Sequence, residues 1–223
     1  MAGELEEMPL FPLHTVLFPY APLHLHVFEP RYREMISHCT QNDVGFGVVL
    51  IRDGEETGEA DPYLVGTAVT IARVQTFDDG KLDVLVHGQR RFRVRRIDEE
   101  SKPYLVGYVE PVVEMKFDES ARADKLAAAL REHVAKYIQG EFRRHDVMIQ
   151  EISLPADPAA LSFVIASLLK IENIEKQRLL ETVDTLGRIS DMIPILEQHI
   201  ADGQTVAECK ASAQMLSEWI TPN

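Results

Sequence analysis

The period of the hydrophobic pattern changes near Met115, and this change limits the possible folds more than any other feature of the sequence. Before it, apolar and β-branched residues form short runs that are continuous or alternate with polar residues, which is typical of strands. After it, apolar residues recur at the helical period of about 3.6 residues. The sequence therefore predicts an α+β protein with two lobes, a β-rich lobe over residues 1–116 and a helical lobe over residues 117–223.

The β-rich lobe is predicted to be a twisted antiparallel structure with one helix. Asp79-Gly80 suits the positive φ values of a tight turn, so a two-residue hairpin turn is expected between Thr67–Phe77 and Lys81–Val86. Pro30 favours the first position of a helix and follows Glu29, which suits a helix N-terminus. The other strands are expected at residues 44–51, 90–97 and 104–113.

Four helices and a terminal fifth are predicted in the second lobe. Asp157-Pro158 begins one of them, which is apolar almost all round and is therefore expected to be buried. Pro194 lies inside another and is expected to kink it. Thr205 and Glu208 have the spacing of a capping box, which predicts a last helix. The expected helices cover residues 119–140, 159–170, 173–180, 184–201 and 206–219.

Four ordered motifs of this chain resemble the N-terminal domain of the ATP-dependent Lon protease family, a module that also appears in cereblon. They are the PLFPL segment Pro9–Leu13, the FEPRYR run Phe28–Arg33, the strand entry Gly66-Thr67 and the hairpin end Gly88–Phe92. The resemblance covers roughly residues 8–200. It implies a pseudo-barrel-like antiparallel β-domain with one helix, followed by a helical bundle. It also implies a free-standing substrate-recognition region of the Lon type.

Composition and charge exclude several other classes of protein. The formal net charge is −13, and a negative field opposes binding to nucleic-acid phosphates. No apolar run approaches the ~20 residues that span a bilayer, and the acidic N-terminus does not resemble a secretion signal. Cys39 and Cys209 are isolated thiols rather than a disulfide framework. A cytoplasmic protein that binds neither nucleic acid nor membrane is expected.

The motifs of ATP hydrolysis and proteolysis do not occur in the sequence. The only Gly-Lys pair, Gly80-Lys81, lies in the expected hairpin and is followed by Leu82 rather than by the Ser or Thr of a phosphate-binding loop. There is no GxSxG, HExxH or CxxC motif. We therefore expect no enzymatic activity, no ATPase or protease domain and no cofactor.

His24 and His26 are two residues apart on an expected strand, so their rings should lie on the same face. With His14 they form a conceivable zinc pair, or they are surface side chains near a proline-bounded edge. A stable zinc site ordinarily has four ligands, and no Cys or carboxylate cluster lies nearby in sequence. The prediction is that these histidines bind no structural metal.

Two surfaces are candidates for binding an extended peptide. Phe18-Pro19-Tyr20 places aromatic rings beside prolines, where apolar contact can tolerate many sequences. Of the neighbouring aromatics, Phe11 and Phe28 are expected in the core, whereas Phe18 and Tyr20 are open between core and surface. The second surface is a strand face formed by Arg91, Arg93 and Arg95, which either receives acidic segments or pairs with neighbouring acids.

The function expected from these features and from the resemblance is non-catalytic binding of protein. The partners are unfolded or extended protein segments, or a protease or chaperone, and the chain is expected to be a monomer or a weak homodimer. The alternative is a structural or regulatory adaptor that self-associates or docks one partner. In that case the expected docking surface is on the last helix, at Met215, Leu216, Trp219 and Ile220.

Overall fold

The computed structural model describes residues 5–56, 58, 60–115, 121–143, 149–152, 154–201 and 220–222. The chain forms two compact units, one of residues 1–113 with 172–181 and the other of residues 114–171 with 182–223. The first unit ends at residue 113, whereas a boundary was expected after residue 116. In addition, residues 172–181, which were expected in the helical lobe, belong with the β-rich unit. The α+β fold class is confirmed.

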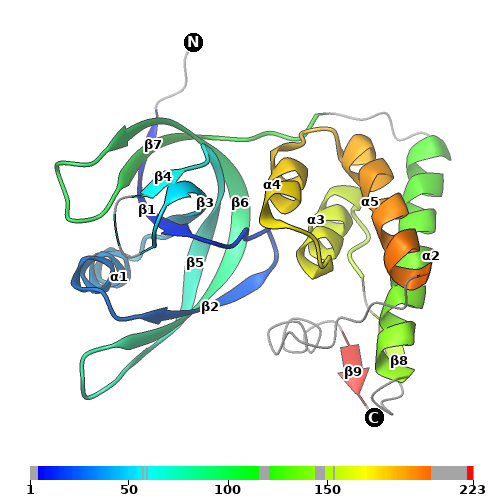
Figure 1. Cartoon of the computed structure of the whole chain (residues 1–223), viewed down its shortest axis with the longest axis horizontal. Coiled ribbons are helices and arrows are strands. Elements are labelled where there is room, and N and C mark those ends of the chain that lie inside the picture. The colour runs from blue at the N-terminus through cyan, green and yellow to red at the C-terminus, as the bar shows by residue number, and fades with distance from the viewer. Residues whose placement is uncertain are drawn as a thin grey trace. The chain divides into compact units, whose positions relative to one another are not determined.

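The β-rich unit is a barrel that β1 closes (Figure 1). Its first half, Glu6–Pro9, pairs antiparallel with β7, and its second half, Leu10–Leu13, pairs parallel with β3. The parallel pair departs from the expected all-antiparallel arrangement, and it requires the crossover that β2 and α1 provide. The strands are β1 (Glu6–Leu13), β2 (Pro22–Val27), β3 (Phe46–Gly54), β4 (Ala60–Pro62), β5 (Val65–Thr76), β6 (Leu82–Asp98) and β7 (Val106–Pro111).

The barrel core explains two glycines of the chain. The fully buried ring of Phe92 occupies the space that side chains at Gly47 and Gly66 would need. A Cβ atom on Gly47 would lie 2.5 Å from Phe92 Cζ, and one on Gly66 would lie 2.9 Å from the same atom. Leu10 and Val109 complete the centre of this cluster, together with Met8, Val49, Ala68 and Val94.

β6 is one strand of 17 residues, not the two strands predicted from the sequence. Its first half pairs with β2 and its second half with β7, while β5 lies along the opposite edge. Gly88, where a break was expected, exchanges backbone hydrogen bonds with the segment before β2: it donates to Ala21 O (2.9 Å) and accepts from Tyr20 N–H (2.8 Å). β6 continues through Gly88 because the segment before β2 forms hydrogen bonds with both the N–H and the C=O group of Gly88.

The hairpin between β5 and β6 has a three-residue loop, not the predicted two-residue turn. Gly80 N–H donates to Phe77 O, and Phe77 N–H donates to Lys81 O, both at 2.9 Å. Among the loop residues only Gly80 has a positive φ, 77°. A β-turn followed by one left-handed residue is the common geometry of three-residue hairpin loops. Asp79 does not take the left-handed conformation, and its carboxylate instead accepts from Lys81 N–H (3.1 Å).

Replacing Gly80 by valine is expected to lower the free energy of unfolding by about 1–3 kcal/mol, because a β-branched residue is strained at positive φ. Gly80→Asn is the control, since asparagine tolerates this conformation. Either side chain would displace the flexible end of Arg33, so the difference between the variants isolates the backbone. Chemical denaturation measures both. Equal stabilities would contradict the assigned loop geometry.

α1 (Pro30–Asn42) begins at Pro30 as predicted and ends at Asp43, which has the left-handed φ of 54°. Its buried face presents Tyr32, Met35, Ile36 and Cys39. Burial raises the pKa of the Cys39 thiol to about 11, so this thiol is protonated at neutral pH. Cys39 thus acts as an apolar core residue.

α4 (Asn173–Glu181) belongs to the β-rich unit because its polar side chains bond to the barrel backbone. Gln177 Nε2 donates to Val65 O (2.9 Å), and Asn173 Nδ2 donates to His14 O (2.6 Å). In return, Arg91 Nη1 of β6 donates to Leu180 O (2.5 Å). Leu179 and Leu180 of this helix are buried. The helix therefore covers part of the barrel near the start of β5.

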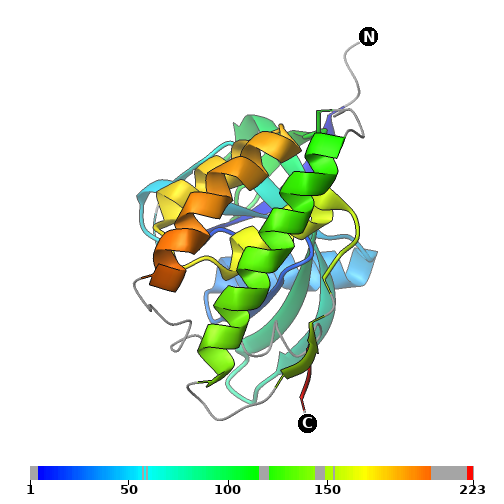
Figure 2. The same ribbon diagram turned by 90° about the vertical axis from the view of Figure 1, so that its right-hand side faces the viewer.

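The helical unit contains α2 (Ala121–Arg143), α3 (Pro158–Leu168) and α5 (Thr185–Ala201), with a short pairing of β8 (Ile149–Ile152) and β9 (Ile220–Pro222). α2 continues past Gly140, where the sequence predicted its end. His133 contacts Glu197, and Tyr137 lies edge-on to His199, so α2 and α5 run side by side in the same direction (Figure 2). The helix expected at 206–219 lies outside the described residues.

α3 is buried almost all round, as predicted, and its N-terminus is capped by Asp157, which accepts from Ala160 N–H (2.7 Å). The helical unit also buries Arg188, whose exposed fraction is 0%. Its guanidinium donates to Ser162 Oγ (2.8 Å) and to Glu114 Oε2 (3.0 Å), and it lies 4.0 Å from the centre of the Phe163 ring.

No described helix has the length and apolar character to cross a membrane.

Candidate functional site

A groove of about 250 Å³ follows β2 from Leu23 to Val27. These consecutive residues point alternately to opposite faces of the sheet and yet all line the groove, so the groove runs along an edge of the strand. The opposite edge pairs with β6, and no β6 residue lines the groove. Among the described residues β2 pairs with β6 alone. The lining residues are Phe11, Leu13, Thr15, Leu23, His24, Leu25, His26, Val27, Phe28, Glu29, Tyr32 and Glu56.

The wall that faces β2 is apolar and rigid. Phe11 and Tyr32 stack with ring centres 4.2 Å apart and both are buried. Burial raises the pKa of Tyr32 to about 12, an effect that Arg31 opposes and that Glu29 and Glu56 reinforce. The Tyr32 hydroxyl therefore stays protonated across the physiological range. Leu13 at the end of β1 extends this wall.

The outer rim of the groove is aromatic and exposed. Phe28 is 50% exposed, and its ring centre lies 6.4 Å from that of His26. Phe77, which follows β5, lies at the same distance from His26 but does not line the groove. His26 Nδ1 is 2.7 Å from Asp83 Oδ1. The sequence placed Phe28 in the core, which is wrong, because Phe28 continues the exposed side of the strand.

His24 and His26 lie on the same exposed face of β2, as the two-residue spacing predicted. Within the described part of the chain, no group of three or more His, Cys, Asp or Glu side chains is arranged to hold a metal ion. The prediction that the two imidazoles bind no structural metal stays a prediction.

The groove is acidic at the end next to Phe28. Arg31 Nε donates to Glu29 Oε2 (3.0 Å), and Arg31 Nη2 donates to the backbone O of Glu56 (2.8 Å). Glu56 Oε1 accepts from the backbone N–H of His14 (2.6 Å). These contacts fix two carboxylates and one guanidinium at this end of the groove.

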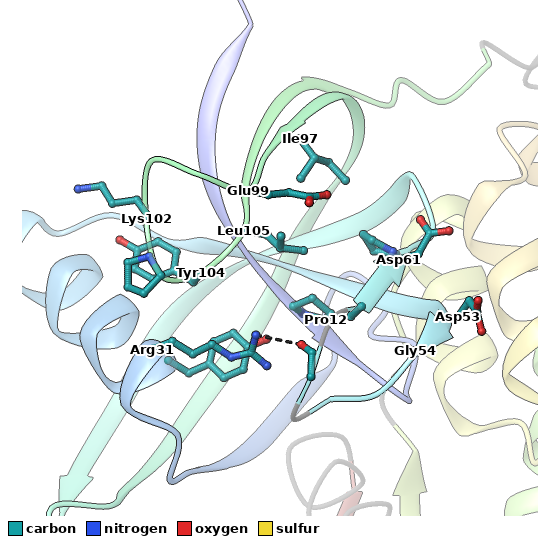
Figure 3. Close-up of a pocket in the computed structure, with 15 residues that line it drawn as sticks. Pro12, Arg31, Asp53, Gly54, Asp61, Ile97, Glu99, Lys102, Tyr104 and Leu105 are labelled. Atoms are coloured by element: carbon teal, nitrogen blue, oxygen red, sulfur yellow. Dashed lines mark hydrogen bonds between the residues drawn. The ribbon is translucent and has the colours of Figure 1, made fainter.

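A second pocket of about 570 Å³ lies between α1, β4 and the segment before β7 (Figure 3). Asp53 and Asp61 lie across it from Arg31, which donates to Gly58 O (3.0 Å). Lys102 points away from the other labelled side chains. Asp61 pairs with Arg52. Charged and apolar side chains line this pocket together. No nucleophile among them is paired with a base, so the lining indicates no particular reaction.

The aromatic-proline segment predicted from the sequence is divided between core and surface. Phe18 is 1% exposed and Pro19 is buried, so neither is available to a ligand. Tyr20 is 48% exposed and has an uncommon positive φ of 68°. It lies two residues before β2, near the start of the groove. Of this predicted contact surface only Tyr20 remains exposed.

The three arginines do not form one open face. Arg91 is 3% exposed because it lies under α4, where it bonds to Leu180 O. Arg93 is half-buried, and Arg95 pairs with Glu110 (2.6 Å). A bulge between Val94 and Arg96 interrupts the alternation. Phe92 and Val94 of the same strand are buried in the barrel core.

Sequence reasoning missed Phe28 and the unpaired edge of β2. A signal for Phe28 was present, because it shares its even position with His24 and His26, and alternate residues of a strand share a face. No signal in the sequence indicated which edge of β2 lacks a neighbour. Strand neighbours come from distant parts of the chain and are fixed by the closed barrel.

Comparison with known proteins places these features in one family. Residues 7–198 match the family model described as the ATP-dependent protease La (LON) substrate-binding domain. The chain is 28% identical over 194 residues to Lon protease 2 of Myxococcus xanthus, and it is 29% identical over 199 residues to the Lon protease of Trichlorobacter lovleyi. Each match covers 86% of this chain but only 23% and 24% of those proteins. The chain thus spans about a quarter of the length of the curated relatives it matches.

Two solved structures have the same fold. A Lon N-terminal domain protein from Xanthomonas campestris aligns with a TM-score of 0.63 and 28% identity over 85% of this chain and 98% of that one. The N-terminal domain of a Mycobacterium avium complex Lon protease aligns with a TM-score of 0.62 over 87% of this chain and all of that one. Its 18% identity supports the fold alone.

Proposed function

Because the chain belongs to the LON substrate-binding domain family, we propose that its β-rich unit binds extended protein segments by adding them as a strand to the free edge of β2. The observation that carries the proposal is the groove along this edge. One of its sides offers unpaired backbone groups and the other offers the buried Phe11–Tyr32 stack. The activity is binding rather than catalysis.

Strand addition suits a protein that must accept many sequences. Backbone N–H and C=O groups are common to all peptides, so hydrogen bonds to a strand edge supply affinity without reading side chains. Alternate side chains of the added strand would contact either the groove wall or the exposed face with Phe28 and His26. The groove is smaller than the ~300–1,000 Å³ pockets of drug-sized ligands, so it fits side chains of a passing segment. Clients are therefore unfolded or extended regions rather than small molecules.

The whole protein acts, in this proposal, as a carrier that presents client segments to a protease or chaperone. The names of its relatives describe proteases, and the matched region of the family is described as substrate-binding. The adaptor alternative rests on residues 215–220, most of which lie outside the described part of the chain. No observation in the described part favours it.

The test is fluorescence anisotropy with a labelled, uncharged peptide rich in Val, Ile and Phe. A matched peptide carries N-methyl groups on alternate residues, in two versions that cover the two alternating sets of amides. One version is expected to lose binding at least tenfold, because each hydrogen bond to the edge contributes about 0.5–1.5 kcal/mol. If both methylated versions bind as well as the parent peptide, strand addition is ruled out.

Phe28→Ser is expected to weaken binding of the parent peptide by about tenfold, because burying half of a phenylalanine against a ligand contributes roughly 1–1.5 kcal/mol. Phe77→Ser is the matched control, since Phe77 is 38% exposed and contacts His26 but does not line the groove. Both variants should keep the wild-type denaturation midpoint. An equal loss in the two variants would place the site on the face of the sheet instead of its edge.

A further inference from the structure

We propose that the β2 groove prefers segments that carry a lysine or arginine next to their apolar stretch, at the end of the groove near Phe28. The inference rests on the proposed function, and it names the class of client. It is argued from the charges that line the groove.

Glu56 supplies the surplus negative charge of this end. Its Oε1 accepts from the neutral backbone N–H of His14 (2.6 Å), and within the described residues no cationic side chain forms an ion pair with it. Glu29 is different, because its carboxylate already pairs with Arg31 (3.0 Å). One guanidinium is therefore set against two carboxylates, which leaves one uncompensated negative charge.

The position of this charge follows from the contacts of Arg31. One guanidinium bonds both the Glu29 carboxylate and the backbone oxygen of Glu56. Glu29 follows Phe28 directly in the chain, so Glu56 lies at the same end of the groove. A client whose apolar residues contact Phe28 would bring its next residue beside the Glu56 carboxylate. A cationic side chain there gains an ion pair, and an acidic one is repelled.

The arginines of β6 do not supply the opposite preference. Arg91 is buried, and Arg95 is neutralised by Glu110 (2.6 Å). None of the three arginines lines the groove. The net charge of −13 acts in the same direction as Glu56, because it raises the local concentration of cationic segments. The preference for acidic flanks that the arginine pattern suggested is thereby reversed.

Other titratable side chains near the groove include His14, whose backbone bonds Glu56, Tyr32 of the groove wall, and His24, His26 and Asp83. Protonated imidazoles would oppose a cationic client, whereas Asp83 contacts His26 and faces the outer side of the sheet. Measurements are therefore made at a single pH of 8, above the range in which histidine side chains ordinarily titrate. The variables are then the flanking residue of the peptide and the residue at position 56.

The experiment compares three labelled peptides that share one apolar core and differ only in a flanking Lys, Gln or Glu residue. The Kd of the Lys peptide is expected to be about two- to fivefold lower than that of the Gln peptide at low salt, which is the range of an exposed ion pair. The Glu peptide should bind more weakly than the Gln peptide. High salt should reduce these differences.

Glu56→Gln should abolish the preference, so that the Lys, Gln and Glu peptides bind with similar Kd values, because glutamine still accepts the His14 N–H but carries no charge. Glu56→Lys should invert the preference in favour of the Glu peptide. Glu110→Gln is the control, since it removes a carboxylate of the same unit outside the groove, and it should keep the preference. Flank-independent binding in the wild type, or a preference retained in Glu56→Gln, overturns the inference alone. Absence of binding by all three peptides overturns the proposed function with it.

Discussion

Replacing Arg188 by alanine is expected to lower the free energy of unfolding of the helical unit by about 2–4 kcal/mol, because it removes a large buried side chain together with its hydrogen bonds. The side chain is fully buried, and burial lowers the pKa of its guanidinium while Glu114 raises it. The protein offsets the desolvation of this charge with hydrogen bonds to Ser162 and Glu114 and with the face of the Phe163 ring. Alanine would remove these contacts and would open a cavity, although Glu114 still accepts from Thr185 and Ser162 still donates to Ala159 O.

Chemical denaturation followed by far-UV circular dichroism measures this loss, because the helices of this unit dominate the signal. Arg95→Ala is the control: its ion pair with Glu110 is solvent-exposed, and its loss should cost less than about 1 kcal/mol. If Arg188→Ala destabilises the protein no more than Arg95→Ala, the buried network does not hold the helical unit together.

Phe18→Ala is expected to cost about 3–5 kcal/mol of stability, whereas Phe28→Ala should change it by no more than ~0.5 kcal/mol. Phe18 belongs to the aromatic-proline segment, and Phe28 is an aromatic residue ten positions further along the chain. Their exposed fractions are 1% and 50%. Removal of the Phe18 ring leaves a cavity beneath the segment that bonds to Gly88, while removal of the Phe28 ring changes only a solvated rim.

The pair also separates stability from binding. Phe18→Ala should bind the uncharged Val, Ile and Phe peptide normally at temperatures where it remains folded, and Phe28→Ala should bind it weakly at all temperatures. Denaturation midpoints and anisotropy titrations on the same preparations give both quantities. The opposite assignment, with a stable Phe18→Ala protein that no longer binds, would return the site to the Phe18-Pro19 segment.

The sequence alone determined the local elements of this protein, because they depend on interactions between near neighbours. Pro30 begins α1 since its fixed φ suits a first helical turn, and Asp157 caps α3 through a bond to an amide three residues away. Alternation placed the rings of His24 and His26 on one face of a strand, and both are exposed there. The motifs that resemble the Lon N-terminal domain are also short runs of neighbouring residues, so they could be recognised in the sequence. The family match over residues 7–198 agrees with that resemblance.

The tertiary structure decided everything that depends on a distant neighbour. Period and alternation show which face of an element is apolar, but they do not show what covers the other face. α4 therefore covers Arg91, a residue that the strand pattern had placed on an open arginine face. The parallel pairing of β1 with β3 closes the barrel and leaves β2 with one edge that has no partner among the described strands, and neither feature has a local signal. The candidate site lies at that edge because strand pairing is set by the closure of the whole barrel.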